Sequence, residues 1–226
     1  DYNQFNNTHS IKNNRIKLLG IKQHLRVHGL QQITDEYEIA NLKLIKKASG
    51  YYIKITCFRN QQNNRQTTNQ VVGLDFGIKN NITTSDGEVF NCSIGETKRL
   101  KRLQRKIAKS TKGSNNRNKL RLKLQKEYEY MFNKKKDSSN KVVFHLIKNY
   151  DTIYMQDELI SLWHKGLFGK QVQHSYLGLI KAKLKKQDRV VVIESKYPTT
   201  KMCYECGALN TITLKDRQYI CDCGLN

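Results

Sequence analysis

The order of apolar stretches after residue 70 constrains the fold of this chain more than any other feature. Three short strand patterns come first, two long helical patterns follow, and a strand, a helix and a strand complete the series. Short strands joined by tight turns pair antiparallel, whereas strands separated by a helix pair parallel. The order therefore predicts an α/β fold with a mixed sheet. The last strand, RVVVIESKYPTT, is apolar almost throughout, which predicts a central position in that sheet.

The first strand of the series carries a carboxylate. Residues 71–75 are apolar or small up to Asp75, and the chain then turns back through 82–84. Asp86 and Gly87 form a hairpin signal before a third strand. A lone buried carboxylate destabilises a fold unless it is paired or bound to a metal. We therefore expect Asp75 to be a functional residue in a buried strand; a solvated or turn-capping acid is the alternative.

Further acids end the strand that begins at Ile153. Gln156, Asp157 and Glu158 stand where this strand meets the next helical pattern. If the two acidic strands are neighbours, their carboxylates can converge on Mg²⁺, a hard cation that prefers oxygen ligands. Two such ions activate water and stabilise the leaving oxygen in phosphodiester hydrolysis. The next stretch, FGKQVQHSYLGLIKAKLKK, predicts one helix, whose apolar face consists of Val172, Tyr176, Leu179, Ile180 and Leu184.

The chain is strongly basic, because 41 Lys and Arg stand against 19 Asp and Glu and give a net charge of +22. Such an excess disfavours the compact state through self-repulsion unless a polyanion supplies the countercharge. Nucleic acid is the favoured polyanion, and a membrane surface is the weaker alternative. The sequence contains no apolar run long enough for a transmembrane helix. It begins at Asp1 without a signal-peptide pattern, so we expect part of a longer protein.

Two consecutive helical patterns hold much of this charge. Residues 98–136 contain sixteen Lys and Arg against two acids, Glu127 and Glu129. The apolar stripes of the two helices, the second of which runs from about 117 to 147, are Leu100, Leu103 and Ile107, then Leu120, Leu124, Tyr128 and Met131. A charge run usually marks a solvated face, but in a chain this basic it favours phosphate contact. The candidate nucleic-acid-binding residues are Lys98, Arg99, Lys101, Arg102, Arg105, Lys106, Arg117, Lys119, Arg121 and Lys123.

Four of the six cysteines crowd into the last 24 residues. Cys203 and Cys206 form a C-x-x-C pair, Cys221 and Cys223 are separated by one residue, and Gly follows each pair. This pattern is typical of a zinc ribbon, in which four thiolates hold a structural zinc ion. The shorter second pair predicts a distorted or weaker site. Because clustered cysteines favour a metal over a disulfide framework, we expect a reducing, intracellular compartment.

Residues 1–70 form a β-rich pattern. YEIANLKLIKKASGYYIKITCFRN predicts two strands around a turn at Ser49 and Gly50, and 61–70 predicts a linker. Exposed Lys and Arg on these strands suit a nucleic-acid backbone, although they are also ordinary solubilising residues. These residues alone leave both interpretations open for a small β-rich domain before the α/β sheet.

Together these motifs resemble the TnpB family of transposon-associated, RNA-guided DNA nucleases, which are related to compact type V CRISPR effectors. VVGLDFGIKNNITTSDG resembles the first RuvC motif, IYMQDELISLWHKGLFGKQVQHSYLGLIKAKL the second, and YPTTKMCYECG…CDCG the inserted zinc ribbon. The resemblance implies an RNase H-like RuvC domain over 71–200, with a basic helical insertion over about 96–150. It also implies a wedge-like β-barrel over 1–70 and a zinc ribbon over 201–226.

By the same resemblance, Asp75 is the first catalytic carboxylate of a two-metal Mg²⁺ site, and Glu158 is the second, with Asp157 as the alternative register. A third Asp is expected just past Gly224, which again indicates part of a longer protein. The implied partners are a guide RNA and a DNA target in its double-stranded and single-stranded forms, in a prokaryotic cytoplasm at the nucleoid. A homodimer is left open. The implied activity is cleavage of DNA beside a short flanking motif.

Two other functions stay open from the residues. A relative without nuclease activity would use its guide to occupy DNA and repress transcription. A basic zinc-ribbon, RNA-binding protein of the translation apparatus would explain the charge and the cysteines, but it would leave Asp75 without a role.

Overall fold

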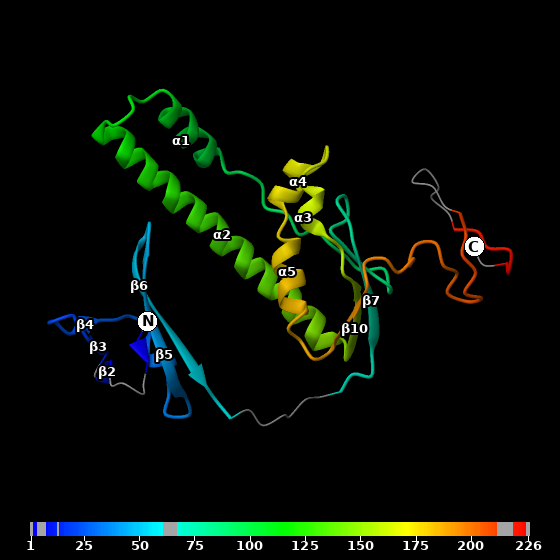
Figure 1. The fold of residues 1–226 in the computed structure, drawn as a ribbon, viewed down its shortest axis with the longest axis horizontal. Helices are drawn as coiled ribbons and strands as arrows, with labels where there is room; N and C mark the ends of the chain where they lie inside the picture. The colour runs from blue at the N-terminus through cyan, green and yellow to red at the C-terminus, as the bar shows by residue number, and fades with distance from the viewer. Residues whose placement is uncertain (1, 4–7, 13, 61–66, 212–218, 225–226) are drawn as a thin grey trace. The chain divides into compact units, whose positions relative to one another are not determined.

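The computed structural model describes residues 2–3, 8–12, 14–60, 67–211 and 219–224 (Figure 1). The chain divides into two compact units, of which one comprises 1–66 and 96–133 and the other 67–95 and 134–226. Among the described residues, no helix combines the length and the apolar character that a membrane span requires.

The first unit contains two small antiparallel sheets. One consists of β1 (Tyr2–Asn3), β5 (Glu38–Lys47) and β6 (Gly50–Phe58), the other of β2 (His9–Lys12), β3 (Arg15–Leu18) and β4 (Leu25–Arg26). The two strands expected around Ser49 and Gly50 are confirmed as β5 and β6. The strands that the structure describes form two separate sheets and not one closed barrel. Within the expected linker, 61–66 lie outside the described residues.

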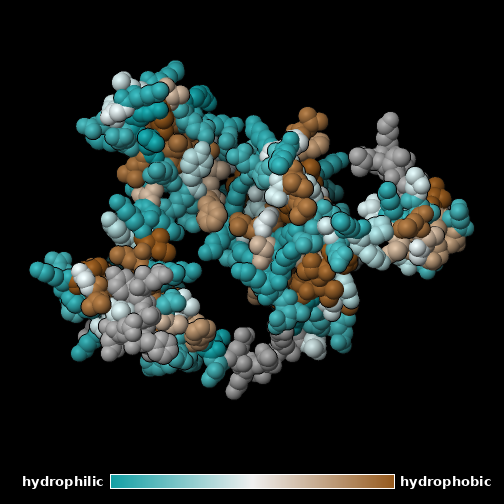
Figure 2. Space-filling model, viewed as in Figure 1, coloured by the Kyte–Doolittle hydropathy of each residue, from teal (hydrophilic) through white to brown (hydrophobic). Residues whose placement is uncertain are grey.

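Two helices follow, α1 (Lys98–Ala108) and α2 (Asn115–Asn149), and both expected basic helices are therefore confirmed. Leu100, Leu103 and Met131 are buried, as their spacing predicts. The expectation for Tyr128 is wrong, because Tyr128 is 48% exposed and Glu127, 7% exposed, takes the buried position. Hydrophilic residues cover most of the visible face of α1 and of the first half of α2 (Figure 2).

The second unit is built on a five-stranded mixed sheet in the order β11 (Val190–Ile193), β10 (Thr152–Gln156), β7 (Val71–Phe76), β8 (Ile82–Thr84) and β9 (Val89–Phe90). Strand β10 is parallel to both β7 and β11, whereas β7, β8 and β9 form an antiparallel meander. The predicted mixed α/β sheet is confirmed. The central position expected for the last strand is wrong, because β11 lies at the edge of the described sheet and Val191 is 43% exposed.

Helices cover one face of this sheet. The second half of α2, α3 (Ile160–Trp163), α4 (Gly169–His174) and α5 (Leu177–Leu184) pack their apolar residues against those of β7, β8 and β10. The single helix expected over this last stretch is two helices. They separate at Ser175 and Tyr176 because the Tyr176 amide donates to the Cys92 carbonyl (2.8 Å) instead of continuing the helix. The expected apolar face is confirmed, since Val172, Tyr176, Ile180 and Leu184 are buried.

Candidate functional site

Asp75 lies on the face of β7 that the helices leave open. Val72, Leu74 and Phe76 point into the core, so strand alternation places Asp75 on the opposite face, where it is exposed. The expectation of a carboxylate inside a buried strand is wrong for this physical reason. Neighbouring atoms still remove part of the water around the carboxyl, and this desolvation raises the pKa of Asp75 above its ordinary value.

Asp75 and Glu158 line the same cleft, which has a volume of about 510 Å³. Strands β7 and β10 are parallel neighbours with Leu74 beside Met155, so the residues that follow in each strand reach the same edge of the sheet. Thr83 lies opposite Asp75 on β8 and also lines the cleft. The sheet register therefore brings together two acids that are 83 positions apart (158 − 75) in the sequence.

Asp157, the alternative to Glu158, is held by Lys181 of α5 and by Lys185, the residue that follows this helix. Its Oδ1 lies 2.7 Å from the Nζ of Lys181 and 2.7 Å from that of Lys185. Hydrogen bonds from Lys181 and then Lys185 lower the pKa of Asp157 to about 2. Lys181 also donates to the Glu158 backbone carbonyl, so this lysine fixes the chain at the point where it leaves β10. Asp157 therefore has the environment of a structural ion pair.

Gln156 also belongs to this site, and its structural role was not predicted from the sequence. Its side-chain amide nitrogen lies 3.3, 3.1 and 2.8 Å from the carbonyl oxygens of Glu194, Ser195 and Tyr197. Its Oε1 accepts a hydrogen bond of 2.9 Å from Thr199. Gln156 thereby holds the segment after β11 beside the cleft, which Thr199 also lines. The one sequence signal was an amide, instead of a carboxylate, at the end of an acidic strand.

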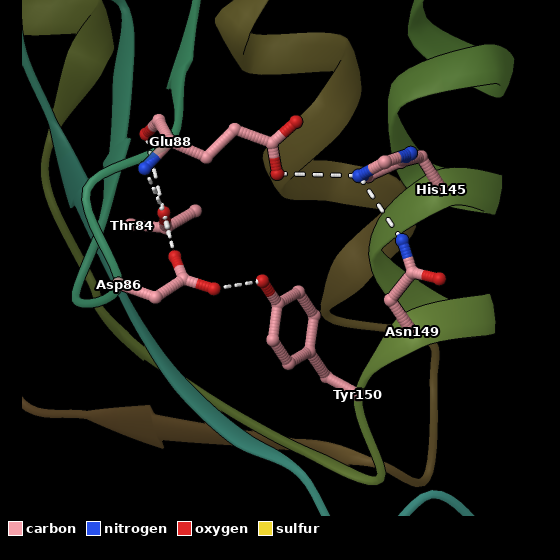
Figure 3. A network of polar contacts seen from close by, with 6 residues as sticks. All are labelled: Thr84, Asp86, Glu88, His145, Asn149 and Tyr150. Atoms are coloured by element: carbon pink, nitrogen blue, oxygen red, sulfur yellow. Dashed lines mark hydrogen bonds and ion pairs between the residues drawn. The ribbon is translucent and has the colours of Figure 1, made fainter.

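A polar network ties the β8–β9 hairpin to the end of α2 (Figure 3). Asp86 in the turn accepts hydrogen bonds from the hydroxyls of Thr84 and Tyr150. These bonds lower the pKa of Asp86, and the bond to Asp86 raises the pKa of Tyr150 to about 12. Glu88 lies 3.2 Å from the Nε2 of His145, also on α2. The network fixes the hairpin whose first strand carries Thr83 beside Asp75.

Two of the ten candidate nucleic-acid-binding residues make contacts within the first unit. The Arg99 Nε lies 3.3 Å from the carboxylate of Glu127. Arg117 donates from one nitrogen to the carbonyls of Ile107 (2.8 Å) and Ser110 (2.7 Å), at the end of α1. The other eight candidates are exposed and form no ion pair with any described residue. They are Lys98, Lys101, Arg102, Arg105, Lys106, Lys119, Arg121 and Lys123.

Glu127 is buried because α1 supplies its partners. The Thr97 hydroxyl donates to Glu127 at 2.7 Å, and Thr97 also caps α1 by accepting from the Leu100 amide at 3.0 Å. With the Arg99 contact, this acid joins the start of α1 to the middle of α2. A buried carboxylate that is both paired and hydrogen-bonded avoids most of the cost of its burial.

The four clustered cysteines meet at one point. Their Sγ atoms all lie within 4.8 Å of one another. The Sγ atoms of Cys203 and Cys223 are 3.6 Å apart, as are those of Cys206 and Cys221. Tetrahedral zinc with Zn–S bonds of about 2.3 Å requires separations of about 3.8 Å, so the cluster fits a metal such as zinc. Gly207 and Gly224 adopt positive φ angles of 74° and 93°, which allow the chain to turn after each pair.

The surroundings of Cys221 and Cys203 favour the thiolate form, whereas hydrogen bonds with the Cys203 and Cys221 thiols raise the pKa of Cys206. The backbone amide of Cys223, followed by the Asn210 side chain, lowers the pKa of Cys221 to about 6. Backbone amides of Cys206 and Glu205 lower the pKa of Cys203. Thiolates are the metal-binding form of cysteine. The one-residue spacing of the second pair therefore still allows a four-sulfur site.

Comparison with known proteins finds one matching family and two similar individual proteins. Residues 54–159, which include Asp75 and Glu158, match the family OrfB_IS605, described as "Probable transposase". A "Putative RNA-guided DNA endonuclease" of Streptomyces pristinaespiralis is 23% identical over an alignment of 224 residues that covers 94% of this chain and 56% of that protein. The "Putative RNA-guided DNA endonuclease InsQ" of Escherichia coli (strain K12) is 29% identical over an alignment of 148 residues that covers 64% of this chain and 36% of that protein.

The chain thus spans 56% and 36% of the lengths of these two curated relatives. The family match covers β7, β8, β9 and β10 together with the basic helices, and the longer of the two relatives' alignments reaches nearly the whole chain. The resemblance seen in the sequence is therefore confirmed: residues 54–159 match the OrfB_IS605 family, and the chain is similar to two proteins that are named putative RNA-guided DNA endonucleases.

Proposed function

We propose that this chain is the nuclease part of a transposon-associated, RNA-guided DNA endonuclease, with Asp75 and Glu158 as its catalytic carboxylates. The observation that carries the proposal is that Asp75 on β7 and Glu158, just after the parallel neighbouring strand β10, line one cleft. An open sheet edge with carboxylates from adjacent strands suits hydrolysis of an extended phosphodiester chain. The order of the five strands and the helices on one face support an RNase H-like, RuvC-type fold for 71–200.

The donor set of the cleft fits Mg²⁺. Both acids offer oxygen, the ligand atom that this cation prefers. When bound, two Mg²⁺ ions supply an activated water and stabilisation of the leaving oxygen. Asp75 and Glu158 would hold the metal, and Thr83 and the Gln156-anchored segment border the same cleft.

Glu158 is favoured over Asp157 as the second carboxylate. Asp157 is engaged by Lys181 and Lys185, whose charges would compete with a metal. Position 156 is also unsuited to a ligand, because its amide nitrogen contacts carbonyl oxygens that would repel a carboxylate. These contacts support the register in which Glu158 faces the substrate strand.

The remaining assignments follow from the charge and the cysteines. The exposed cations of α1 and α2 would contact the phosphates of the guide RNA and of the target DNA, whereas base pairing would supply sequence specificity. We assign 1–70 to a wedge-like nucleic-acid-binding domain and 201–226 to a zinc ribbon in which zinc is structural, because four thiolates leave no open position for chemistry. Such a nuclease would act in a prokaryotic cytoplasm, at the nucleoid.

A guided protein that binds DNA without cutting it is the second candidate. It is favoured by the fact that, among the described residues that line the cleft, Asp75 and Glu158 are the acids present. A nuclease with a two-metal site commonly needs more oxygen ligands than two carboxylates provide. The two candidates share the guide and the target, and they differ in whether a bound strand is hydrolysed.

One experiment tests the site and separates these candidates. The full-length protein, purified with its RNA, is incubated with Mg²⁺ and a plasmid library that has randomised flanks beside the target. Asp75→Asn and Glu158→Gln should each lower cleavage by more than about 100-fold while guided binding persists. Asp157→Asn is the matched control and should retain cleavage. Cutting by Asp75→Asn would exclude this site, and guided binding without cutting by the unmodified protein would identify the second candidate.

A further inference from the structure

The tip of the β5–β6 hairpin in the first unit presents two adjacent tyrosines to solvent. The side chains of Tyr51 and Tyr52 are 69% and 45% exposed. Neighbouring residues of a strand point to opposite faces, so the two rings lie on opposite faces of the hairpin. The core of this unit consists of other residues, and neither ring belongs to it. Two large aromatic side chains that are left in water at one turn indicate a contact surface.

Each of these rings lies beside a lysine of the opposite strand. The Lys46 Nζ is 5.9 Å from the centroid of the Tyr51 ring, and the Lys47 Nζ is 4.9 Å from that of Tyr52. These distances are typical of cation–π contacts, which occupy one side of a ring. The tip therefore combines free aromatic surface with positive charge, and this is the pair of features that binds a nucleobase together with its phosphate.

A cavity of about 420 Å³ opens beside Tyr51. Its volume lies within the range of about 300 to 1,000 Å³ that is typical of small-ligand sites. Leu44 and Ile53, opposite each other in the hairpin, form an apolar wall. Arg26 of β4 lines the cavity as well and lies directly opposite Arg15 in the β3–β4 pair. Two like charges at such positions destabilise a sheet, and an anion bound beside them removes the penalty.

The hairpin tip is held in place by α2. The backbone amide of Ser49 donates to a carboxylate oxygen of Glu129 at 3.2 Å, and the Ser49 hydroxyl donates to the other at 2.5 Å. The same hydroxyl is 2.9 Å from the Tyr52 hydroxyl. These bonds lower the pKa of Glu129, so the anchor is fully ionised at neutral pH. A turn that is fixed in advance loses little conformational entropy when a ligand binds.

We propose that the tip of the β5–β6 hairpin is a binding site for single-stranded nucleic acid, in which a base enters the cavity and stacks on Tyr51 while Arg26 and Lys46 contact its flanking phosphates. The partner is single-stranded because bases within a duplex are already stacked and cannot reach a protruding ring. The chemistry of base and phosphate is common to a strand of RNA and a strand of DNA. The inference rests on the proposed function in taking nucleic acid as the partner, and it adds a sequence-tolerant contact remote in sequence from Asp75.

The test measures oligonucleotide binding by the full chain, freed of nucleic acid, in the Asp75→Asn background so that no strand is cut. Fluorescent single strands of about ten nucleotides, made of RNA or of DNA, are compared with an abasic strand of the same length and with a duplex. Tyr51→Leu should weaken binding of the base-bearing strands about 5- to 150-fold, and it should leave the abasic strand unchanged. Tyr51→Phe keeps the ring and should bind normally. Tyr130→Leu, which removes another exposed ring, is the matched control.

A strand that carries 5-iodouridine should also crosslink to Tyr51 under ultraviolet light, and the arm that responds, RNA or DNA, identifies the source of the base. The proposal would be overturned if the Tyr51→Leu variant and the parent bound the base-bearing RNA and DNA strands equally well. It would also be overturned if Tyr51→Leu weakened binding of the abasic strand alone. Its failure is distinguishable from failure of the proposed function. Guided cleavage with an unaffected Tyr51→Leu variant refutes only the stacking site, whereas Tyr51-dependent binding without guided cleavage refutes only the nuclease.

Discussion

At the scale of single residues, the hydroxyl of Tyr150 and the carboxylate of Asp86 form the contact on which the β8–β9 hairpin most depends. Tyr150, which directly follows α2, is 8% exposed. The hydrogen bond that its hydroxyl donates to Asp86 joins the end of this helix to the hairpin turn (Figure 3). A hydrogen bond to an ionised acceptor is stronger than one between neutral groups. Because this hairpin also carries Thr83 beside Asp75, its position matters to the proposed site.

We predict that Tyr150→Phe lowers the free energy of unfolding by about 1.5 kcal/mol at neutral pH, because Asp86 loses a hydrogen-bond donor. The raised pKa of Tyr150, about 12, means that the folded chain holds this proton more tightly than the unfolded chain, in which the pKa is near 10. The contribution is therefore complete below pH 10 and is lost as the pH rises towards 12. Urea unfolding at neutral pH and at about pH 11 measures both effects.

The substitution should remove this alkaline loss along with the hydrogen bond. Tyr130→Phe, in α2, is the control, because the Tyr130 side chain is 58% exposed and no described partner depends on it. A Tyr150→Phe variant that keeps the full alkaline sensitivity of the parent would show that the hydroxyl of Tyr150 is not its source.

At the scale of elements, the α1–α2 hairpin depends on the buried carboxylate of Glu127. We predict that Glu127→Ala lowers the free energy of unfolding by about 1 to 3 kcal/mol, because Thr97 and Arg99 lose their common partner. The loss should be largest in α1, which is capped by Thr97. Hydrogen exchange of the α1 amides measures it, with the exposed neighbour Lys126→Ala as control. Unchanged protection of α1 in Glu127→Ala would contradict this assignment.

Elements with local signals could be predicted from the sequence. The β5–β6 hairpin is specified by alternation around Ser49 and Gly50, and the β8–β9 hairpin by the Asp86–Gly87 turn. The order of strands and helices likewise predicted the mixed sheet. The two hairpins depend on residues that are close together in the chain, and periodicity reports such features directly.

Elements decided by distant residues could not be predicted. The break between α4 and α5 arises because Tyr176 bonds to Cys92, which is far away in sequence. The burial of Glu127 depends on α1, and the edge position of β11 depends on the strand order. Periodicity cannot report such contacts, and apolarity alone does not separate an edge strand from a central one. The same reasoning explains why Gln156 was missed, since its partners belong to the segment after β11.

The choice between Glu158 and Asp157 is the clearest case at the candidate site. Both are acids at the end of one strand, so the sequence left the register open. Asp157 contacts Lys181 of α5 and Lys185 just after it, whereas Glu158 lines the same cleft as Asp75. A resemblance to a family can favour one register, but the neighbouring charges supply the physical reason.

At the scale of the whole molecule, a net charge of +22 makes binding to nucleic acid a salt-dependent equilibrium. Each phosphate that a cation neutralises releases counterions from a duplex and adds about 0.9 to the slope of log K against log salt. The exposed cations of α1 and α2 are free to act in this way, whereas Arg99 and Arg117 already have partners within their own unit. The ten candidate residues should therefore separate into eight that contact phosphates and two, Arg99 and Arg117, that stabilise the fold.

We predict that Arg102→Gln with Lys106→Gln reduces the steepness of that slope by about 1.8 on duplex DNA, because two phosphate contacts are lost while the fold is unchanged. Arg117→Ala should instead lower the free energy of unfolding, since its guanidinium holds the end of α1 through the Ile107 and Ser110 carbonyls. Binding titrations of the full chain over a range of salt concentrations, together with urea unfolding, measure both quantities. An unchanged slope in the double variant would show that Arg102 and Lys106 do not contact phosphates. Counterion release depends on the number of phosphate contacts and not on where the partner's bases lie.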